Sequence, residues 1–307
     1  MHYPLVVFGV KDTSAEIISY IHKELMPVSL IVTIEEAVTK KNDVAGFQGL
    51  GVLEETLGIP VFEAPSYSLT DEKTAAFFAD NTFELGIVSG WQRLIPKAVL
   101  DAFSVGIFGF HGNAGYLPFG RGRSPLNWSI LLGDTRFNLN LFRYDEKPDS
   151  PNVFATRTFA LNAHDTIRTA QYKNTIASKA LLKELLAAFA KDGKITVRTD
   201  ARDFDSWYEK RTPADGKIDF HGRTRDIYNL IRAVGEPFAG AFCSSNEHTV
   251  RILEAHPFDE ILDFSAYAPG EIIEVFDDKP IVRTVDGSLL IDRYEADIPL
   301  LPGMVLS

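Results

Sequence analysis

Residues 108–134 read FGFHGNAGYLPFGRGRSPLNWSILLGD, and residues 142–149 read FRYDEKPD. Together they predict a strand over 106–111, a loop, a helix over 125–132 that opens with Pro125, and a strand over 138–144. His111 ends the first apolar run, 105–110. Open α/β sheets bind their ligands outside the carboxyl ends of their strands. His111 is therefore a candidate catalytic residue.

The residues before this stretch alternate between apolar runs and helical patterns. Thr13 and Glu16 have capping-box spacing, and apolar residues follow on one helical face up to Leu25. We expect strands over residues 5–9, 28–32 and 85–89, and further helices over residues 47–56, 71–79 and 96–103. Such alternation is typical of an α/β fold with a mostly parallel sheet and helices on both faces.

The pattern of apolar and turn residues changes in the carboxy-terminal part of the chain. A long amphipathic helix is predicted from Asp165 to about Lys191 and stops at Gly193, with a buried side made of Ile176, Leu181, Leu182, Leu185 and Leu186. A polar segment, 200–215, then leads to one helix, 223–234, and to short β-rich runs separated by turn dipeptides. The chain therefore divides into domains 1–200 and 201–307, the second a small β-barrel with one helix.

Composition excludes several classes of function. The formal charge of -11 and the pI near 5.1, without a long Lys/Arg run, disfavour binding of bulk nucleic acid. Cys243 is the single cysteine, so an internal disulfide and a cysteine-based metal cage are excluded. The seven histidines lack close spacing to other metal ligands, and we expect no metal.

Two further features bear on cofactor and location. The pair Gly49 and Gly51 lacks a preceding strand and a third glycine, so we expect no NAD. The sequence contains no run of eighteen apolar residues and no leader pattern at its start, so we expect no membrane contact and a soluble, cytoplasmic protein.

Two constellations in the opening stretch have chemical potential. Arg121 and Arg123 flank Gly122, and two guanidinium groups on a glycine loop can hold phosphate or carboxylate, although a solvated turn would have the same composition. His111 can move a proton near neutral pH, the Asn113 amide can stabilise an oxyanion, and Asp149 can orient the imidazole. A structural histidine is the alternative.

The order of these residues resembles that of the formyltetrahydrofolate-dependent formyltransferases. The matching positions are Gly106, His111, Gly112, Leu117-Pro118, Arg121-Gly122-Arg123, Pro125-Leu126-Asn127-Trp128, Gly133 and Asp149. The segments 211–220, 231–234 and 237–242 resemble the second domain of the sugar N-formyltransferases. The resemblance implies a Rossmann-like catalytic domain followed by an OB-like domain.

The resemblance also implies an activity. The formyl donor would be 10-formyltetrahydrofolate, and the acceptor a dTDP- or UDP-linked amino sugar used in surface polysaccharide or lipopolysaccharide synthesis. By the same resemblance, Gly90, Trp91, Arg93, Leu94 and Ile95, together with Asp149, would border the pterin slot; a plain strand-to-helix connection is the alternative for this loop. The second domain often mediates pairing in this family, which implies a possible homodimer.

The chain departs from the family pattern at one position. Aligned from the upstream strand, His111 matches the family histidine, and Gly109 stands where relatives carry an asparagine. Aligned from Leu117-Pro118, Asn113 matches the histidine instead, and its spacing to Asp149, 149 minus 113 or 36, is that of the family. We prefer His111 as the catalytic base, because its strand aligns without a break, with Asn113 as the amide donor.

Three other functions fit parts of the same pattern. Methionyl-tRNA formyltransferase shares donor and fold, but the acidic charge and the acidic, hydroxyl-rich segment 64–74 disfavour a tRNA substrate. Glycinamide ribonucleotide formyltransferase usually consists of the first domain alone. A non-catalytic module that binds folate or sugar nucleotide is the third, because the asparagine is missing at Gly109.

Overall fold

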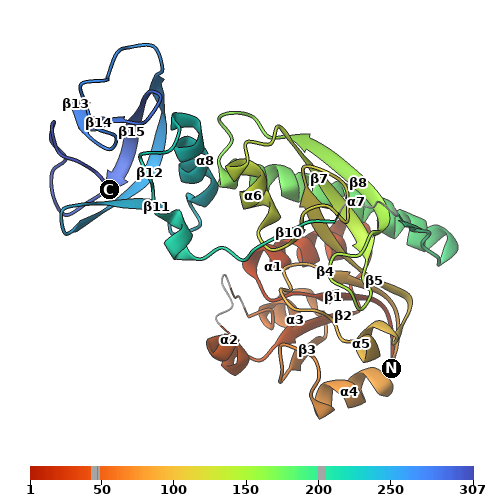
Figure 1. Ribbon diagram of the computed structural model, residues 1–307. Helices are drawn as coiled ribbons and strands as arrows, with labels where there is room; N and C mark the ends of the chain where they lie inside the picture. The colour runs from red at the N-terminus through yellow and green to blue at the C-terminus, as the bar shows by residue number, and fades with distance from the viewer. Residues whose placement is uncertain (43–46, 48, 200–204) are drawn as a thin grey trace. The chain divides into compact units, whose positions relative to one another are not determined.

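The computed structural model describes residues 1–42, 47, 49–199 and 205–307 (Figure 1). The described residues divide into two compact units. The first comprises Met1–Arg121, Asn138–Thr158 and Thr175–Ser206, and the second comprises Gly122–Phe137, Phe159–Asn174 and Trp207–Ser307. The domain boundary expected between residues 200 and 201 lies outside the described residues, so the division into 1–200 and 201–307 stays a prediction.

A large, mainly parallel sheet forms the centre of the first unit, as predicted. Among the described residues its order is β3-β2-β1-β4-β5-β7-β8-β9. The strands from β3 to β5 are parallel to their neighbours, whereas β7 runs antiparallel to β5. The bounds are β1 His2–Phe8, β2 Leu30–Ile34, β3 Val61–Ala64, β4 Thr82–Val88, β5 Phe103–Asn113, β7 Arg136–Arg143, β8 Asn152–Ala160 and β9 Arg198–Thr199.

Helices follow the strands of this unit along the chain (Figure 1). Their bounds are α1 Asp12–Tyr20, which continues as the π-helix η1 Ile21–Leu25, then α2 Glu36–Asn42, α3 Val52–Leu57, α4 Glu72–Ala79, α5 Lys97–Leu100, and α7 Ile167–Asp192, which extends over both units. The helix predicted over 47–56 is shorter at its start, since α3 begins at Val52; residue 48 of that range lies outside the described residues.

Two expectations for this region were wrong or incomplete. Ile176 was expected on the buried side of the long helix, but it is 70% exposed. The buried stripe of α7 passes through Ala177, Leu181 and Leu185, four residues apart, and Ile176 lies off it. The strand β8 was not predicted, because its residues are mostly half-buried and show no clean alternation.

The second unit contains an antiparallel sheet of order β11-β12-β15-β14-β13, counted over the described residues. The bounds are β11 Ala241–Ser245, β12 His248–Asp259, β13 Ile272–Phe276, β14 Lys279–Arg283 and β15 Ser288–Glu295. Helix α8, Thr224–Val234, packs against β12 (Figure 1). Cys243 is buried in this core as a packing residue, and burial raises the pKa of its thiol to about 12.

The last residues of the chain join the two edge strands of this sheet. On the β13 side, the Ile272 amide donates to the Met304 carbonyl at 2.8 Å, and the Leu306 amide donates to the Gly270 carbonyl at 2.8 Å. On the β11 side, Ser244 and Ser307 exchange two main-chain hydrogen bonds of 2.7 and 2.8 Å. The sheet is thereby closed into the small β-barrel that the sequence predicted.

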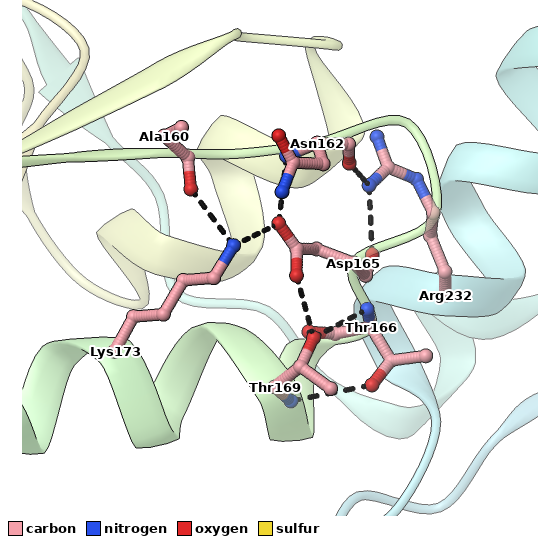
Figure 2. Close-up of polar contacts among 7 residues, drawn as sticks. All are labelled: Ala160, Asn162, Asp165, Thr166, Thr169, Lys173 and Arg232. Carbon is pink, nitrogen blue, oxygen red and sulfur yellow. Dashed lines mark hydrogen bonds and ion pairs between the residues drawn. The ribbon is translucent and has the colours of Figure 1, made fainter.

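A buried polar network ties α8 to the start of α7 within the second unit (Figure 2). The Arg232 guanidinium, 7% exposed, donates to the carbonyls of Asn162 and Asp165 at 3.2 and 2.8 Å. The Asp165 carboxylate accepts from the Asn162 amide at 2.6 Å, from Thr169 Oγ1 at 3.0 Å and from Lys173 Nζ. Burial raises the pKa of the Asp165 carboxyl, but these hydrogen bonds outweigh burial, and the net pKa is lowered.

The network should make stability depend on pH. Because the folded-state pKa of Asp165 is lowered, its contribution is present at neutral pH and is lost as the pH falls below about 4. We expect Asp165→Asn to lower the free energy of unfolding by about 3 kcal/mol at pH 7, and the deficit to shrink in acid. Denaturant unfolding at several pH values measures this. Asp192→Asn, an exposed change at the far end of α7, is the control. A deficit that is constant with pH would contradict the role of the carboxylate.

Candidate active site

His111 lies near the end of β5, where its neighbour across the sheet is Asn140 of β7. The side chain is 6% exposed. Its Nε2 lies 2.7 Å from the Gly120 carbonyl oxygen, and its Nδ1 lies 3.3 Å from Oδ1 of Asp149, whose side chain is 20% exposed. The structure thus brings together the predicted histidine and aspartate, although 38 residues, 149 minus 111, separate them.

Each nitrogen of the His111 ring faces a different oxygen. A carbonyl oxygen only accepts, so Nε2 of His111 carries a proton that it donates to Gly120. Nδ1 faces a carboxylate, which also only accepts when it is ionised. One ring nitrogen therefore contacts a main-chain acceptor, and the other lies beside a carboxylate. Such a pair can both supply and accept a proton.

A short loop presents Asp149 to the histidine. Asp149 has a φ of 50°, an uncommon backbone conformation for a residue with a side chain. Asp145 stabilises the loop, because its carboxylate accepts from the Lys147 amide at 2.7 Å, from Ser150 Oγ at 2.5 Å and from Asn152 Nδ2 at 2.9 Å. The sequence analysis did not predict Asp145, although an aspartate two residues before a loop amide is a common turn signal.

Asn113 ends β5 and is fully buried. Its Nδ2 donates to the Phe119 carbonyl, and its Oδ1 accepts from the Gly115 amide at 2.7 Å. Asn138 supports the same loop, donating to the Gly115 carbonyl at 2.5 Å and accepting from Thr158 Oγ1 at 2.7 Å. Both polar groups of Asn113 therefore bind the main chain of the loop that follows β5.

Two buried asparagines of β7 were missed by the sequence analysis. Asn138 and Asn140 are each 1% exposed, and Asn140 donates to the His111 carbonyl at 3.2 Å while accepting from Thr156 Oγ1 at 2.7 Å. A signal for them exists: two polar residues at a spacing of two interrupt the apolar run 137–142. On a buried strand this spacing puts both side chains on one face, where each requires a partner.

Gly109 lies two residues before His111, so the two positions face the same side of the sheet. A Cβ built on Gly109 would lie 2.5 Å from the hydroxyl oxygen of Tyr144 and 2.7 Å from its Cζ. The ring of Tyr144 therefore fills the space that a side chain at position 109 would need. Tyr144 was not among the residues predicted from sequence.

The predicted arginine loop falls on both units. Arg121 pairs through its guanidinium with Asp205 and donates to the Pro148 carbonyl at 3.4 Å, next to Asp149. In the second unit, Gly122 has a φ of 104°, and a Cβ there would lie 2.3 Å from the Tyr208 carbonyl oxygen. The Arg123 side chain is exposed.

The short strands β6, Arg121–Gly122, and β10, Trp207–Tyr208, pair at this point. We expect Gly122→Ala to disrupt that pairing, because it adds backbone strain and a clash with main chain that cannot move aside. The expected loss of unfolding free energy is at least about 2 kcal/mol, measured by thermal or denaturant unfolding. Gly49→Ala is the control, since nothing lies within 4 Å of a Cβ at that position. Equal stability of the two variants would contradict the assignment.

The residues predicted to border a pterin differ in exposure. Trp91 and Ile95 are buried, at 7% and 3% exposed, whereas Leu94 is 57% exposed. The Arg93 guanidinium lies over the Tyr67 ring, 5.3 Å from its centroid. Gly90 has a φ of 79°, and a Cβ there would lie 2.5 Å from Ser14 Oγ. The buried members anchor this loop in the core, and the exposed members face outward.

A solvent-open cavity of about 600 Å³ adjoins the histidine strand. Its lining comes from α5, from the first half of β5 including Ile107, and from the segment that follows β7. Tyr144 contributes to this wall as well as filling the space at Gly109. Tyr144 therefore borders the open cavity and also contacts the strand that carries His111.

Two absences hold for the described residues of the chain. Within them, no three His, Cys, Asp or Glu side chains are grouped so that they could hold a metal ion. No helix in the same ranges combines the length and the apolar character that crossing a membrane requires.

Residues 5–186 match the formyl transferase family, and residues 210–297 match the C-terminal domain of formyl transferases. The chain belongs to the formyl transferase family. The family resemblance and the fold class expected from the sequence are confirmed. The matched segments cover the α/β sheet with His111 and Asp149, and the β-barrel, respectively.

Solved structures share the fold of this formyl transferase at low identity. HypX from Aquifex aeolicus, in complex with tetrahydrofolic acid, is 19% identical with a TM-score of 0.63; the match covers 97% of this chain but 45% of HypX, so the chain spans less than half of that protein. The N-formyltransferase from Helicobacter canadensis, in complex with folinic acid and dTDP-3-aminofucose, is 15% identical with a TM-score of 0.67, and 94% of this chain and 98% of that one are covered. A sugar N-formyltransferase from a Shewanella species is 14% identical, with a TM-score of 0.59 and coverages of 86% and 99%.

Proposed function

We propose that the chain transfers a formyl group from 10-formyltetrahydrofolate to the primary amine of a nucleotide-linked amino sugar, with dTDP or UDP as the nucleotide. The contact between His111 and Asp149 at the end of β5, in a chain of the formyl transferase family, carries this proposal. The folate and amino-sugar ligands of the Helicobacter canadensis protein support it. We further propose a cytoplasmic, homodimeric enzyme of surface polysaccharide or lipopolysaccharide synthesis.

The reaction proceeds through a tetrahedral intermediate. The neutral amine of the sugar attacks the formyl carbon, a new C–N bond forms, and the carbonyl oxygen becomes an oxyanion. The amine then loses a proton, N10 of the folate gains one, and the bond between N10 and the formyl carbon breaks. The products are the N-formyl sugar nucleotide and tetrahydrofolate. No metal or nicotinamide cofactor takes part in this scheme.

His111 and Asp149 move the proton in this scheme. As the acceptor binds, its amine takes the place of the Gly120 carbonyl, which lies 2.7 Å from Nε2 of His111 in the structure. The neutral ring then holds its one proton on Nδ1, toward Asp149, so that Nε2 accepts the proton of the amine. The adjacent Asp149 stabilises the imidazolium that results and passes the proton toward N10. Asn113, predicted as an amide donor, contributes by holding the loop with both of its polar groups.

The donor binds on the side of the 89–96 loop. Trp91 and Ile95 anchor that loop through burial, and Leu94 offers exposed apolar surface to a flat heterocycle. Gly90 keeps the turn compact, and Arg93 is available to the polar part of the folate. Asp149, next to His111, is the last of the residues that we propose to contact the folate.

The arginines of the loop divide two tasks. Arg121 is engaged with Asp205 and with the Pro148 carbonyl, so it stabilises the loop that presents Asp149. Arg123 is exposed, and its side chain makes no hydrogen bond or ion pair with a described residue. Its guanidinium suits the pyrophosphate of a sugar nucleotide. Gly122 lets the main chain of β6 approach that of Tyr208 closely.

Methionyl-tRNA formyltransferase activity is the second candidate. It would share the donor and the His111–Asp149 pair, but the net charge of -11 opposes the approach of a tRNA backbone. Formylation of charged tRNA with a steep dependence on salt would favour it over the sugar substrate. Binding of folate and sugar nucleotide without any formylated product would indicate a non-catalytic module.

A screen of amino-sugar nucleotides with 10-formyltetrahydrofolate, read by mass spectrometry, tests the proposal. We expect a product heavier by one formyl group with at least one dTDP- or UDP-linked sugar. His111→Asn should lower kcat by about 100-fold or more, because it removes proton transfer. His221→Asn, on an exposed site of the second unit, is the control. Full turnover by His111→Asn would contradict the assignment of the base.

The role of Arg123 has a separate test. We expect Arg123→Ala to raise the KM for the sugar nucleotide by about 10-fold with little change in kcat, because the contact is present in both ground and transition states. The turnover of the amino sugar without its nucleotide should stay the same. Arg198→Ala, another exposed arginine, is the matched control. A fall in kcat at constant KM would contradict a binding role.

A further inference from the structure

The proposed reaction needs a hydrogen-bond donor for the oxyanion. Preorganised donors at this position are among the largest contributions to catalysis of acyl transfer. Asn113 has its amide engaged with Phe119, and Gly109 has no side chain to offer. His111 alone would have to move the proton and bind the oxyanion. A second donor on the same face of β5 would separate these tasks.

Tyr144 places a hydroxyl on that face. Its oxygen lies 2.5 Å from the Cβ position of Gly109. Gly109 and His111 are two residues apart on β5, so this hydroxyl and the His111 side chain lie on the same face of the sheet. Tyr144 also lines the open cavity.

The Tyr144 ring is held in place by its main chain and by a neighbouring ring. The Tyr144 amide donates to the Ile107 carbonyl at 2.8 Å, and the ring stacks on Phe142 with centroids 5.0 Å apart. The hydroxyl itself makes no hydrogen bond with any residue that the structure describes. A rigid ring with an uncommitted donor is preorganised for a ligand, since no protein bond must break first.

The surroundings keep the Tyr144 hydroxyl protonated. Burial and then the negative charge of Asp149 raise the pKa of this hydroxyl above its usual range. At neutral pH the phenol therefore retains the proton that it would donate. The same negative charge stabilises positive charge on His111, so one carboxylate supports opposite roles in its two neighbours.

We propose that Tyr144 is a catalytic residue whose hydroxyl donates a hydrogen bond to the formyl oxygen as that oxygen becomes an oxyanion. The inference rests on the proposed formyl transfer. Tyr144 keeps its proton throughout: the hydrogen bond shortens as the amine attacks the carbon, and lengthens as the bond to N10 breaks. The amine proton follows the route through His111 and Asp149.

Tyr144→Phe tests the inference, because it removes the hydroxyl and leaves the ring. With the sugar nucleotide found in the screen, we expect kcat to fall by about 100-fold and the KM of both substrates to change by less than about 3-fold. The melting temperature should equal that of the wild type. Tyr20→Phe is the matched control, since Tyr20 is also partly buried in the first unit and lies outside the site.

The possible outcomes separate the inference from the proposed function. A wild type that turns over and a Tyr144→Phe variant with the same kcat would overturn the role of Tyr144 alone. A wild type that formylates no acceptor would overturn both. A loss of kcat with unchanged melting temperature and KM supports both.

A second pair of variants tests the same role by relocation. Tyr144→Ala opens the space at position 109, and adding Gly109→Asn then returns an amide donor to the strand two residues before His111. We expect the double variant to have a kcat at least about 10-fold above that of Tyr144→Ala, which is part of what one oxyanion donor supplies. Equal turnover of the two proteins would overturn the inference.

Discussion

Strand β7 runs antiparallel to β5 and sets Asn140 opposite His111 and Asn138 opposite Asn113. Every group of the candidate site depends on this register. The β7 asparagines bond to the end of β5 and to the loop that follows it, and the chain that leaves β7 carries Tyr144 and then Asp149. A shift of one residue would turn each of these side chains to the other face of the sheet. The buried hydrogen bonds of the asparagine side chains make such a shift costly, because breaking each one would leave a buried polar group without a partner.

Much of the fold follows from hydrophobic pattern, and so does the position of His111. Short apolar runs such as 85–89 predicted the strands of the parallel sheet, since strands buried on both faces read as continuous apolar stretches. The half-exposed β8 has no such pattern, and the buried side of α7 excludes Ile176 because helical phase, not hydrophobicity alone, decides which residues face the core. The barrel was predicted from turn spacing, but its closure by Met304, Leu306 and Ser307 depends on main-chain hydrogen bonds that side-chain identity does not reveal.

The site was predictable where chemistry depends on residue type, and less so where it depends on partners. Residue chemistry and the family order suggested His111 and Asp149 as members of one site, and the structure places Nδ1 and Oδ1 of the two 3.3 Å apart. For Asn113 and Arg121 the residue type was not enough. The sequence suggested that both side chains bind a ligand, but in the structure they bind Phe119 and Asp205. A sequence lists donors and acceptors without showing which of them are already satisfied. Burial of an amide or guanidinium in such contacts changes its role from binding a ligand to shaping the loop that binds it.

Gly109 and Tyr144 form one structural unit although 35 residues, 144 minus 109, separate them. A Cβ at position 109 would lie 2.5 Å from the tyrosine ring, so a side chain there requires a smaller residue at position 144. A donor in front of His111 can therefore come from β5 itself or from the segment after β7, but not from both. This chain has the tyrosine on the segment after β7, and a phenol differs from an amide as a donor. A phenol donates a single hydrogen bond from a rigid ring, whereas an amide offers two donors and an acceptor on a flexible stem. The absence of a side chain at position 109 is therefore the condition that admits the tyrosine ring. Burial, together with the negative charge of Asp149 on the adjacent loop, raises the pKa of that phenol and keeps it in its donating form.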